Sequence, residues 1–287
     1  MLPPSPVPYC DRMRLTGSTI VLTGATSGIG RATALALAAA GPRRLVVHGP
    51  QPAAEVTELT GELAAALGPA GDVVYLRADY GVLAEVAELA AAVRAACPGG
   101  VDLLINNAGR PGPPARTLTA DGHEATLQTN YLAPVALTTL LSGAVRRIVN
   151  VASATHFSAE LGLDDLELAG PGYSPASAYA RSALALVTWS CRLAGHRPRP
   201  VDDVVSVHPG VIATDLLHAM FSLGGDPPEH AAATLLAVAR VSGDNGTYYD
   251  ERRPATPSPI ALDSVAQELL DQLTLRALAP VLPAASA

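Results

Sequence analysis

A glycine-rich turn between an apolar run and an Ala/Leu-rich segment constrains this chain more than any other feature. We expect residues 18–22 to form a buried strand and residues 31–40 a helix, with Gly24, Gly28 and Gly30 between them. A glycine turn that leads from a strand into a helix presents backbone N–H groups, and a dinucleotide pyrophosphate binds there. The spacing G-x-x-x-G-x-G also fits a turn with a purely structural role, so other motifs must decide between the two interpretations.

Apolar runs and amphipathic segments alternate along the rest of the chain, which favours βαβ units and a parallel sheet. The apolar spacing predicts helices such as 29–40 and 82–93. Strands are expected at 18–23, 44–48, 72–77, 101–106, 146–152, 203–208 and 246–249. The fold class is therefore α/β: a single Rossmann-type doubly wound domain with a seven-stranded parallel sheet flanked by helices. It should span residues 15–278, between a flexible extension (1–14) and a flexible tail (279–287).

Composition excludes several classes of function. The formal net charge of −7 argues against a nucleic-acid partner. The seven histidines and three cysteines are scattered, so we expect no metal site and no disulfide framework. No apolar run is long enough to span a bilayer, and the N-terminus lacks the pattern of a signal peptide. These features together predict a cytoplasmic location.

Polar motifs follow several predicted strands, at the sheet edge where ligands bind. Residues 106–109 (Asn-Asn-Ala-Gly) end the fourth strand, Ser153 follows the fifth, and residues 209–214 follow the sixth. Tyr179 comes after Ser153 along the chain. Asp79 ends the third strand, where its carboxylate would either accept a hydrogen bond from an adenine amino group or cap the loop.

Taken in order with the glycine turn, these motifs resemble the short-chain dehydrogenase/reductase family. The resemblance covers about residues 15–278. Residues 118–122 and 128–132 are similar to the family's fourth-helix segment. Residues 246–249 and 257–259 are similar to the end of its retinol-dehydrogenase-like branch.

The resemblance implies a role for each site residue. Tyr179 would be the general acid/base that donates a proton to a carbonyl oxygen or removes one from an alcohol. Ser153 would hydrogen-bond the same oxygen, and Asn130 would hold a proton-relay water by kinking its helix. The implied cofactor residues are Gly24, Thr26, Ser27, Gly28, Ile29, Gly30, Asp79, Tyr80, Asn107, Ala108, Gly109, Pro209, Gly210, Ile212 and Thr214, the last of which would fix the nicotinamide carboxamide.

The chain departs from the family pattern Tyr-x-x-x-Lys. Ala183 stands where the lysine is expected, and the chain contains no lysine at all. The family lysine lowers the pKa of the tyrosine and binds the nicotinamide ribose. Arg181 lies two residues from Tyr179, so it points to another side of the helix and cannot substitute directly. The loss predicts either a slow or rearranged reductase, or chemistry at Tyr179 without hydride transfer.

The identity of the cofactor rests on the end of the second strand. Residues 47–51 contain neither the acid typical of NAD sites nor an arginine typical of NADP sites. The missing acid, together with Arg31, Arg43 and Arg44, favours NADP(H) over NAD(H).

The expected partners are a lipophilic small-molecule substrate and a second copy of the chain. Apolar residues after the sixth strand suggest the substrate: Leu216, Leu217, Met220 and Phe221. They fit core packing of a short helix equally well. The family's habit of pairing helices across a two-fold axis predicts a homodimer. The helix around Tyr179 carries the apolar residues for it: Ala180, Ala183, Leu184, Val187 and Trp189.

Three hypotheses for function follow. The first is an NAD(P)(H)-dependent oxidoreductase that acts on a carbonyl or alcohol of a lipophilic small molecule, in bacterial natural-product biosynthesis. The second is a non-redox enzyme on the same fold, a dehydratase, isomerase or cyclase, that uses Tyr179 and Ser153 as acid/base groups. The third is a catalytically silent regulator that binds NADP. The presence of Ser153, Tyr179 and Asn130 together argues against the third.

Overall fold

A computed structural model describes residues 13–195, 201–214 and 224–283 of the 287-residue chain. The strands are β1 (Thr19–Leu22), β2 (Arg44–Gly49), β3 (Asp72–Arg77), β4 (Val101–Asn106), β5 (Val145–Val151), β6 (Asp203–His208), β7 (Tyr248–Asp250) and β8 (Arg253–Ala255). The α-helices are α1 (Gly28–Ala39), α2 (Thr57–Leu67), α3 (Leu83–Ala96), α4 (Ala125–Leu127), α5 (Ala133–Leu140), α6 (Pro175–Gly195), α8 (Pro228–Ala239) and α9 (Ser264–Leu278). Tighter or wider turns form η1 (Ala53–Val56), η2 (Gln128–Leu132), η3 (Ala154–Ser158) and η4 (Pro259–Leu262).

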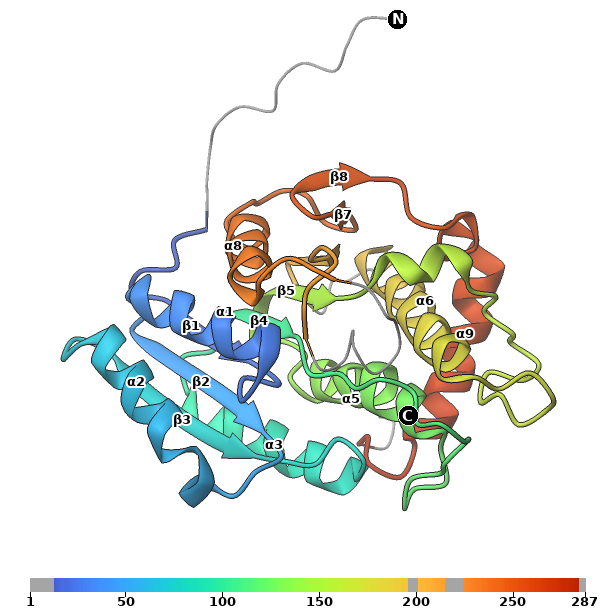
Figure 1. The fold of residues 1–287 in the computed structure, drawn as a ribbon, viewed down its shortest axis with the longest axis horizontal. Helices are drawn as coiled ribbons and strands as arrows, with labels where there is room; N and C mark the ends of the chain where they lie inside the picture. The colour runs from blue at the N-terminus through green and yellow to red at the C-terminus, as the bar shows by residue number, and fades with distance from the viewer. Residues whose placement is uncertain (1–12, 196–200, 215–223, 284–287) are drawn as a thin grey trace, which may run out of the picture.

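The strands form one sheet in the order β3-β2-β1-β4-β5-β6-β7-β8 (Figure 1). Strands β1 to β7 are parallel, as predicted, and every predicted strand lies within two residues of an observed one. The eighth strand was not expected: β8 pairs antiparallel with β7 through a tight turn at Glu251, whose φ is 53°. The strand order reverses between β1 and β4, and ligands of doubly wound sheets bind at such a switch point.

Alternate side chains of the central strands face opposite layers of helices. Leu103 and Ile105 of β4 pack on the side of α1, α2 and α8, whereas Leu104 packs on the side of α3, α5, α6 and α9. The blue helix α1 and the orange helix α8 are far apart in the sequence but lie together (Figure 1). Burial on both faces is the reason why the strands read as continuous apolar runs. None of the helices in the described ranges is both long and apolar enough to cross a membrane.

The structure removes the argument for a homodimer through α6. Leu184 and Val187 are fully buried, and Ala180, Ala183 and Trp189 are nearly so, all within a single chain. Helix α9 and the turn η4 pack against α6 and help to cover it. These apolar residues therefore serve the core of one molecule, and they do not form a free face for a second copy.

A buried ion pair ties β5 to the end of α8 and the loop after it. The Arg147 side chain is 4% exposed and donates to both carboxylate oxygens of Asp244, at 2.7 and 3.1 Å. It also donates to the Val238 carbonyl, and Asp203 lies 3.5 Å away. Asp244 accepts a further hydrogen bond from the Tyr249 hydroxyl, so this carboxylate joins β5 and β7.

We expect Asp244→Asn to lower the free energy of unfolding by about 3 kcal/mol, because it leaves the buried Arg147 guanidinium short of charge compensation. Asp202→Asn is the matched control: Asp202 is 76% exposed and 3.8 Å from Arg146, so its loss should cost less than about 1 kcal/mol. Urea unfolding of both variants measures the difference, and equal losses would show that the Arg147 pair adds nothing beyond a surface contact.

Candidate active site

The glycine turn can be made only by glycine at two of its positions. Gly24 has a φ of +67°, and a Cβ there would lie 2.6 Å from Cα of Ala108. A Cβ on Gly30 would collide with the carbonyl oxygen of Gly24. The turn therefore packs directly against the start of the loop after β4, and helix α1 begins close to the strand that precedes it.

Hydrogen bonds join the glycine turn to the end of β4. The hydroxyl of Thr23 accepts from the backbone N–H groups of Asn107 and Ala108, both at 3.0 Å. In return, the side-chain amide of Asn107 donates to the carbonyls of Thr23 and Gly24, at 2.9 and 3.1 Å. Four contacts between β1 and β4 thus fix the turn at the switch point of the sheet. Asn107 and Ala108, both predicted from the sequence, lie where the cofactor cleft should be.

A buried histidine supports the turn from beneath. His48 is 2% exposed, and its Nδ1 accepts the backbone N–H of Gly24 at 3.3 Å. Its Nε2 lies 3.0 Å from the carbonyl of Ala78, so the ring carries its proton on Nε2. Burial lowers the pKa of His48 to about 4, so the ring is neutral near pH 7. Sequence reasoning missed this residue, because its partners lie 24 and 30 positions away.

The loop after β6 closes over the other side of the turn. The side chain of Thr214 lies against Gly28, where a Cβ would come within 3.3 Å of its Cγ2. Ile212 is buried and forms a β-bridge with Asp226. Pro209 and Gly210 begin the loop, and Gly210 has a φ of +108°. The predicted residues of this loop and of the glycine turn are therefore brought together.

The remaining predicted cofactor residues differ from one another in their contacts. Ser27 precedes α1 and makes no capping hydrogen bond, so its exposed hydroxyl stands at the helix N-terminus. Oδ1 of Asp79 accepts the backbone N–H of Gly81 at 2.8 Å, which is the loop-capping alternative, and adenine recognition stays a prediction. The Tyr80 ring is buried and stacks on His48 at 4.7 Å, so the cofactor contact predicted for Tyr80 stays untested. Thr26 and Ile29, also predicted, belong to the turn and the first turn of α1.

The turn fits a dinucleotide phosphate on physical grounds. The first turn of α1 contains no acidic residue, so nothing opposes an anion at its N-terminus. A Cβ on Gly24 or Gly30 would clash with neighbouring backbone, and the backbone N–H groups of the turn are what a phosphate needs. No group of three or more His, Cys, Asp or Glu side chains within the described residues is arranged to hold a metal ion.

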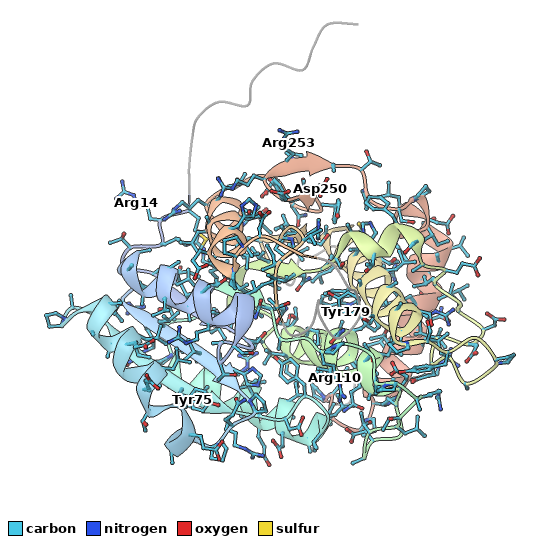
Figure 2. The ribbon with its side chains drawn as sticks, in the orientation of Figure 1. Arg14, Tyr75, Arg110, Tyr179, Asp250 and Arg253 are labelled. Carbon is cyan, nitrogen blue, oxygen red and sulfur yellow. The ribbon has the colours of Figure 1, made fainter. Side chains whose placement is uncertain are left out.

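Ser153 and Tyr179 meet beyond the end of β5. Ser153 precedes the short helix η3, and its hydroxyl lies close enough to the phenol of Tyr179 to lower the pKa of that phenol. Tyr179 is on α6 (Figure 2). The Ser153 Oγ also accepts from the backbone N–H and the hydroxyl of Thr155, at 3.2 and 3.0 Å. Sequence reasoning missed Thr155, although Ser-x-Thr at a strand end is a recognisable turn signal.

Asn130 lies on an irregular helix. Residues Gln128–Leu132 form η2, a turn of π-helix, and interruptions of this kind are common causes of kinks. The Asn130 side chain accepts the Arg110 backbone N–H at 2.8 Å and donates to the Arg110 carbonyl at 3.0 Å. It also donates to Ser182 on α6 at 3.3 Å. Asn130 thus joins the loop after β4 to the helix that carries Tyr179, whereas its water-holding role stays a prediction.

Tyr179 has no cation beside it in the described part of the chain. Burial raises the pKa of Tyr179 above its ordinary value of 10.0, and the nearby Ser153 hydroxyl opposes this only in part. Ala183 is buried at 6% exposure. Arg181 donates to the carbonyls of Glu160 and Asp165, and it does not act on the pKa of Tyr179, so it does not replace the lysine.

Two of the arginines that favoured NADP(H) lie at the wrong end of the sheet. Arg43 donates to the side chain of Thr19, which begins β1. Arg44 pairs with Asp72, which begins β3. The glycine turn follows the opposite ends of these strands, so neither arginine reaches it. Arg31 is on α1 near the turn, but it pairs with Glu62 at 2.5 Å.

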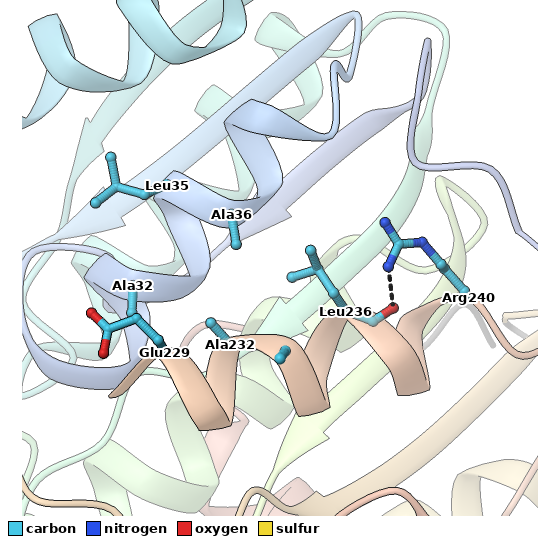
Figure 3. A pocket seen from close by; sticks show the side chains of 8 residues that line it. Ala32, Leu35, Ala36, Glu229, Ala232, Leu236 and Arg240 are labelled. Carbon is cyan, nitrogen blue, oxygen red and sulfur yellow. Dashed lines mark hydrogen bonds between the residues drawn. The ribbon is translucent and has the colours of Figure 1, made fainter. Parts of the chain in front are cut away.

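One pocket of the structure lies apart from this site (Figure 3). It has a volume of about 430 Å³ and sits between α1 and α8, where alanine and leucine side chains line it. Glu229 and Arg240 are its charged residues, and it contains none of the predicted catalytic groups. The predicted substrate-wall residues Leu216, Leu217, Met220 and Phe221 lie outside the described residues.

Comparisons with known proteins agree with this arrangement. The family model described as short chain dehydrogenase matches residues 18–222. A protein of Streptomyces sp. (strain C5), named "Putative daunorubicin C-13 ketoreductase DnrU", is 35% identical over 83% of this chain and 85% of its own length. Human retinol dehydrogenase 13 is 32% identical over 90% of this chain and 84% of its own length. The solved structure of a Burkholderia cenocepacia short chain dehydrogenase in complex with NADP is 26% identical, with a TM-score of 0.65 over 84% of this chain and 98% of that one.

We expect Gly24→Ala to weaken dinucleotide binding by about tenfold or more, because the strained φ and the contact with Ala108 must both be relieved. Gly61→Ala is the matched control. Gly61 lies within α2 with open space around its Cα, so binding should stay unchanged and the helix should gain about 0.5–1 kcal/mol. Calorimetric titration with NADPH and NADH measures both effects, and an absence of heat from the unaltered protein would refute the cofactor site.

The neutral His48 predicts a pH dependence of stability. Its folded-state pKa of about 4 is below the ordinary 6.5, so the unfolded chain binds more protons between these values. Stability should therefore rise with pH from about 4 to 6.5, and this ring contributes at most about 1.4 kcal/mol per pH unit. His48→Asn keeps an acceptor for Gly24 but cannot titrate. Urea unfolding at pH 4.5 and 6.5 should show a smaller difference for this variant, and an unchanged difference would contradict the assignment.

Proposed function

The chain belongs to the short-chain dehydrogenase/reductase family, in its retinol-dehydrogenase-like part, and we propose that it reduces a carbonyl group of a lipophilic small molecule with NADP(H). The observation that carries the proposal is that Ser153 and Tyr179 lie together at the sheet edge that also holds a glycine turn fit for a dinucleotide. Oxidoreductase names among the relatives support the redox class.

The chain's own residues supply the proton and hold the reacting oxygen. The nicotinamide, when bound, supplies the hydride that adds to the carbonyl carbon. The phenol of Tyr179 donates a proton to the carbonyl oxygen, and the Ser153 hydroxyl donates a hydrogen bond to the same oxygen. Thr155 donates to Ser153 and so orients its hydroxyl. The carbonyl thereby gains one hydride and one proton and becomes an alcohol.

The raised pKa of Tyr179 keeps the phenol in the protonated form that a reduction uses. A phenol that keeps its proton through the neutral range can donate it to a carbonyl oxygen. Oxidation of an alcohol starts from the phenolate, and this form is scarce at neutral pH without a nearby cation. The protonated phenol therefore fits an assay in the direction of reduction, and the ketoreductase name of a relative at 35% identity agrees with it.

NADP(H) is the proposed cofactor because no acid follows β2, where an NAD site would have one. The structure of the relative in complex with NADP adds support. The lipophilic substrate and the place in natural-product biosynthesis are supported by the names of the relatives, a daunorubicin ketoreductase and a retinol dehydrogenase. We further propose that the protein acts in the cytoplasm.

A non-redox reaction is the second candidate, and the environment of Tyr179 favours it. In the described ranges no positive charge acts on the phenol, and the lysine that would bind the nicotinamide ribose is missing. Ser153 and Tyr179 would then serve as acid/base groups for a dehydration, isomerisation or cyclisation. Incubation of NADPH and all-trans-retinal with the protein without oxygen, followed by product mass, separates the two: reduction adds two hydrogens and consumes NADPH.

We expect Ala183→Lys to raise retinol oxidation at pH 7 by about 10²-fold, because a cation one helical turn from the phenol lowers its pKa. The pH profile of oxidation should also move toward neutrality. Ala183→Met fills similar space without charge and should bring no such gain. Stopped assays of retinol and retinal at pH 6–10 measure both directions.

Tyr179→Phe on top of Ala183→Lys should remove the gain, because the lysine acts through the phenol. If the native reaction is non-redox, Ala183→Lys should leave the reductase rate near zero. Should Tyr179→Phe alone leave the native reaction untouched, the catalytic assignments of this section would be wrong.

A further inference from the structure

A second buried histidine touches the catalytic serine, and the proposed mechanism does not use it. His156 is fully buried on η3, three residues after Ser153. Its Nδ1 lies 2.8 Å from the carbonyl oxygen of Ser153, which also accepts the backbone N–H of His156 at 3.1 Å. On the opposite side of the ring, Nε2 accepts the backbone N–H of Ser258 at 3.2 Å. One side chain thus joins two segments that are 102 residues apart.

Only one state of the ring satisfies both contacts. A carbonyl oxygen can only accept, so Nδ1 must carry the proton that goes to Ser153. A backbone N–H can only donate, so Nε2 must be the unprotonated nitrogen that faces Ser258. Burial lowers the pKa of His156, and His208 adds to this effect, so the neutral ring is favoured. The contacts therefore fix both the charge and the tautomer.

Aromatic neighbours fix the plane of the ring. Phe157 lies on it with a centroid distance of 4.0 Å, and Tyr248 of β7 lies 4.8 Å away. Phe157 and Tyr248 meet edge to face at 5.9 Å. The ring is thus held from two sides, and its two nitrogens have fixed directions.

The contact with Ser153 is not a nucleophilic pair. A general base that activates a serine must reach its hydroxyl, whereas His156 reaches the carbonyl of Ser153. The Ser153 hydroxyl is hydrogen-bonded to Thr155 and lies beside the phenol of Tyr179. His156 therefore acts on the backbone that carries the hydroxyl, and it touches no reacting atom.

We propose that His156 is a positioning residue that anchors Ser153 to the segment between β8 and α9. The inference rests on the proposed function, since it matters to catalysis only if Ser153 binds the reacting oxygen. Ser258 immediately precedes η4, and η4 packs on α6, the helix that carries Tyr179. The histidine thus completes a closed path from Ser153 through Ser258 to the helix of its catalytic partner. The relative positions of the serine and tyrosine hydroxyls depend on that path.

Two substitutions at His156 separate its contacts. His156→Asn places an amide N–H where Nδ1 was and keeps the bond to Ser153, whereas His156→Gln reaches the position of Nε2 and keeps the bond to Ser258. Both lose the ring stacking to a similar extent. With all-trans-retinal and NADPH, we expect kcat to fall about 10²-fold in both variants, the effect of a misplacement near 1 Å, because each of them cuts the path at one end. The dissociation constant of NADPH should not move in either.

A second pair leaves the histidine in place. Ser258 has a φ of −49°, close to the range that proline adopts, so Ser258→Pro removes the N–H donor with little change of backbone. Ser258→Ala keeps that donor. Ser258→Pro should lower kcat more than Ser258→Ala, and this pair still decides the question if the His156 variants do not fold.

The tautomer provides a readout apart from activity. ¹⁵N spectra of histidine-labelled protein should show His156 protonated on Nδ1. His48, which is protonated on Nε2, provides an internal reference for the other tautomer. An Nε2 proton on His156, an unchanged kcat in either His156 variant, or equal kcat values for Ser258→Pro and Ser258→Ala would overturn the proposal. Ser153→Ala distinguishes a failure of the proposed function from a failure of this inference. If the variant leaves retinal reduction intact, both fail. If it abolishes reduction while Ser258→Pro and Ser258→Ala have equal kcat values, only this inference fails.

Discussion

The close approach of the glycine turn to the end of β4 is the contact on which the rest of the site depends. Gly24 can lie against Ala108 only because it lacks a Cβ and tolerates a positive φ. That approach lets the hydroxyl of Thr23 and the amide of Asn107 exchange hydrogen bonds across the switch point. The glycine turn and the loop that leads to Asn130 are therefore joined at one edge of the sheet. Asn130 connects this edge to α6 through its hydrogen bond to Ser182.

The sequence predicted the features that depend on local pattern. Apolar runs located the seven parallel strands, and the motifs after them located Asn107, Ser153 and Thr214 at one edge of the sheet. It did not predict β8, because a three-residue strand that contains Pro254 has little pattern of its own. The interpretation of Arg43 and Arg44 was wrong for a related reason: nearness in sequence to β2 does not tell which end of the strand a side chain occupies.

Contacts between segments that are far apart in the sequence account for the other features that could not be predicted. His48 and His156 are lone histidines in the sequence, and each acquires its role from a partner 24 to 102 residues away. The apolar residues of α6 looked like a face for a second copy until α9 and η4, which come more than sixty residues later, proved to cover the helix. Amphipathic spacing shows that a face is buried, and it does not show what buries it.

The groups at the centre of the candidate active site are neutral, so their effect on a bound substrate depends strongly on their alignment. Within the described residues, Tyr179 keeps its proton, no cation stands near it, and both supporting histidines are uncharged. In the proposed reduction, an alkoxide that develops on the substrate is therefore stabilised by hydrogen-bond donors rather than by a fixed charge. The strength of such donors falls steeply with misalignment, whereas the effect of a charge varies slowly with distance. A histidine that fixes the backbone of Ser153 therefore matters more here than it would beside a catalytic lysine.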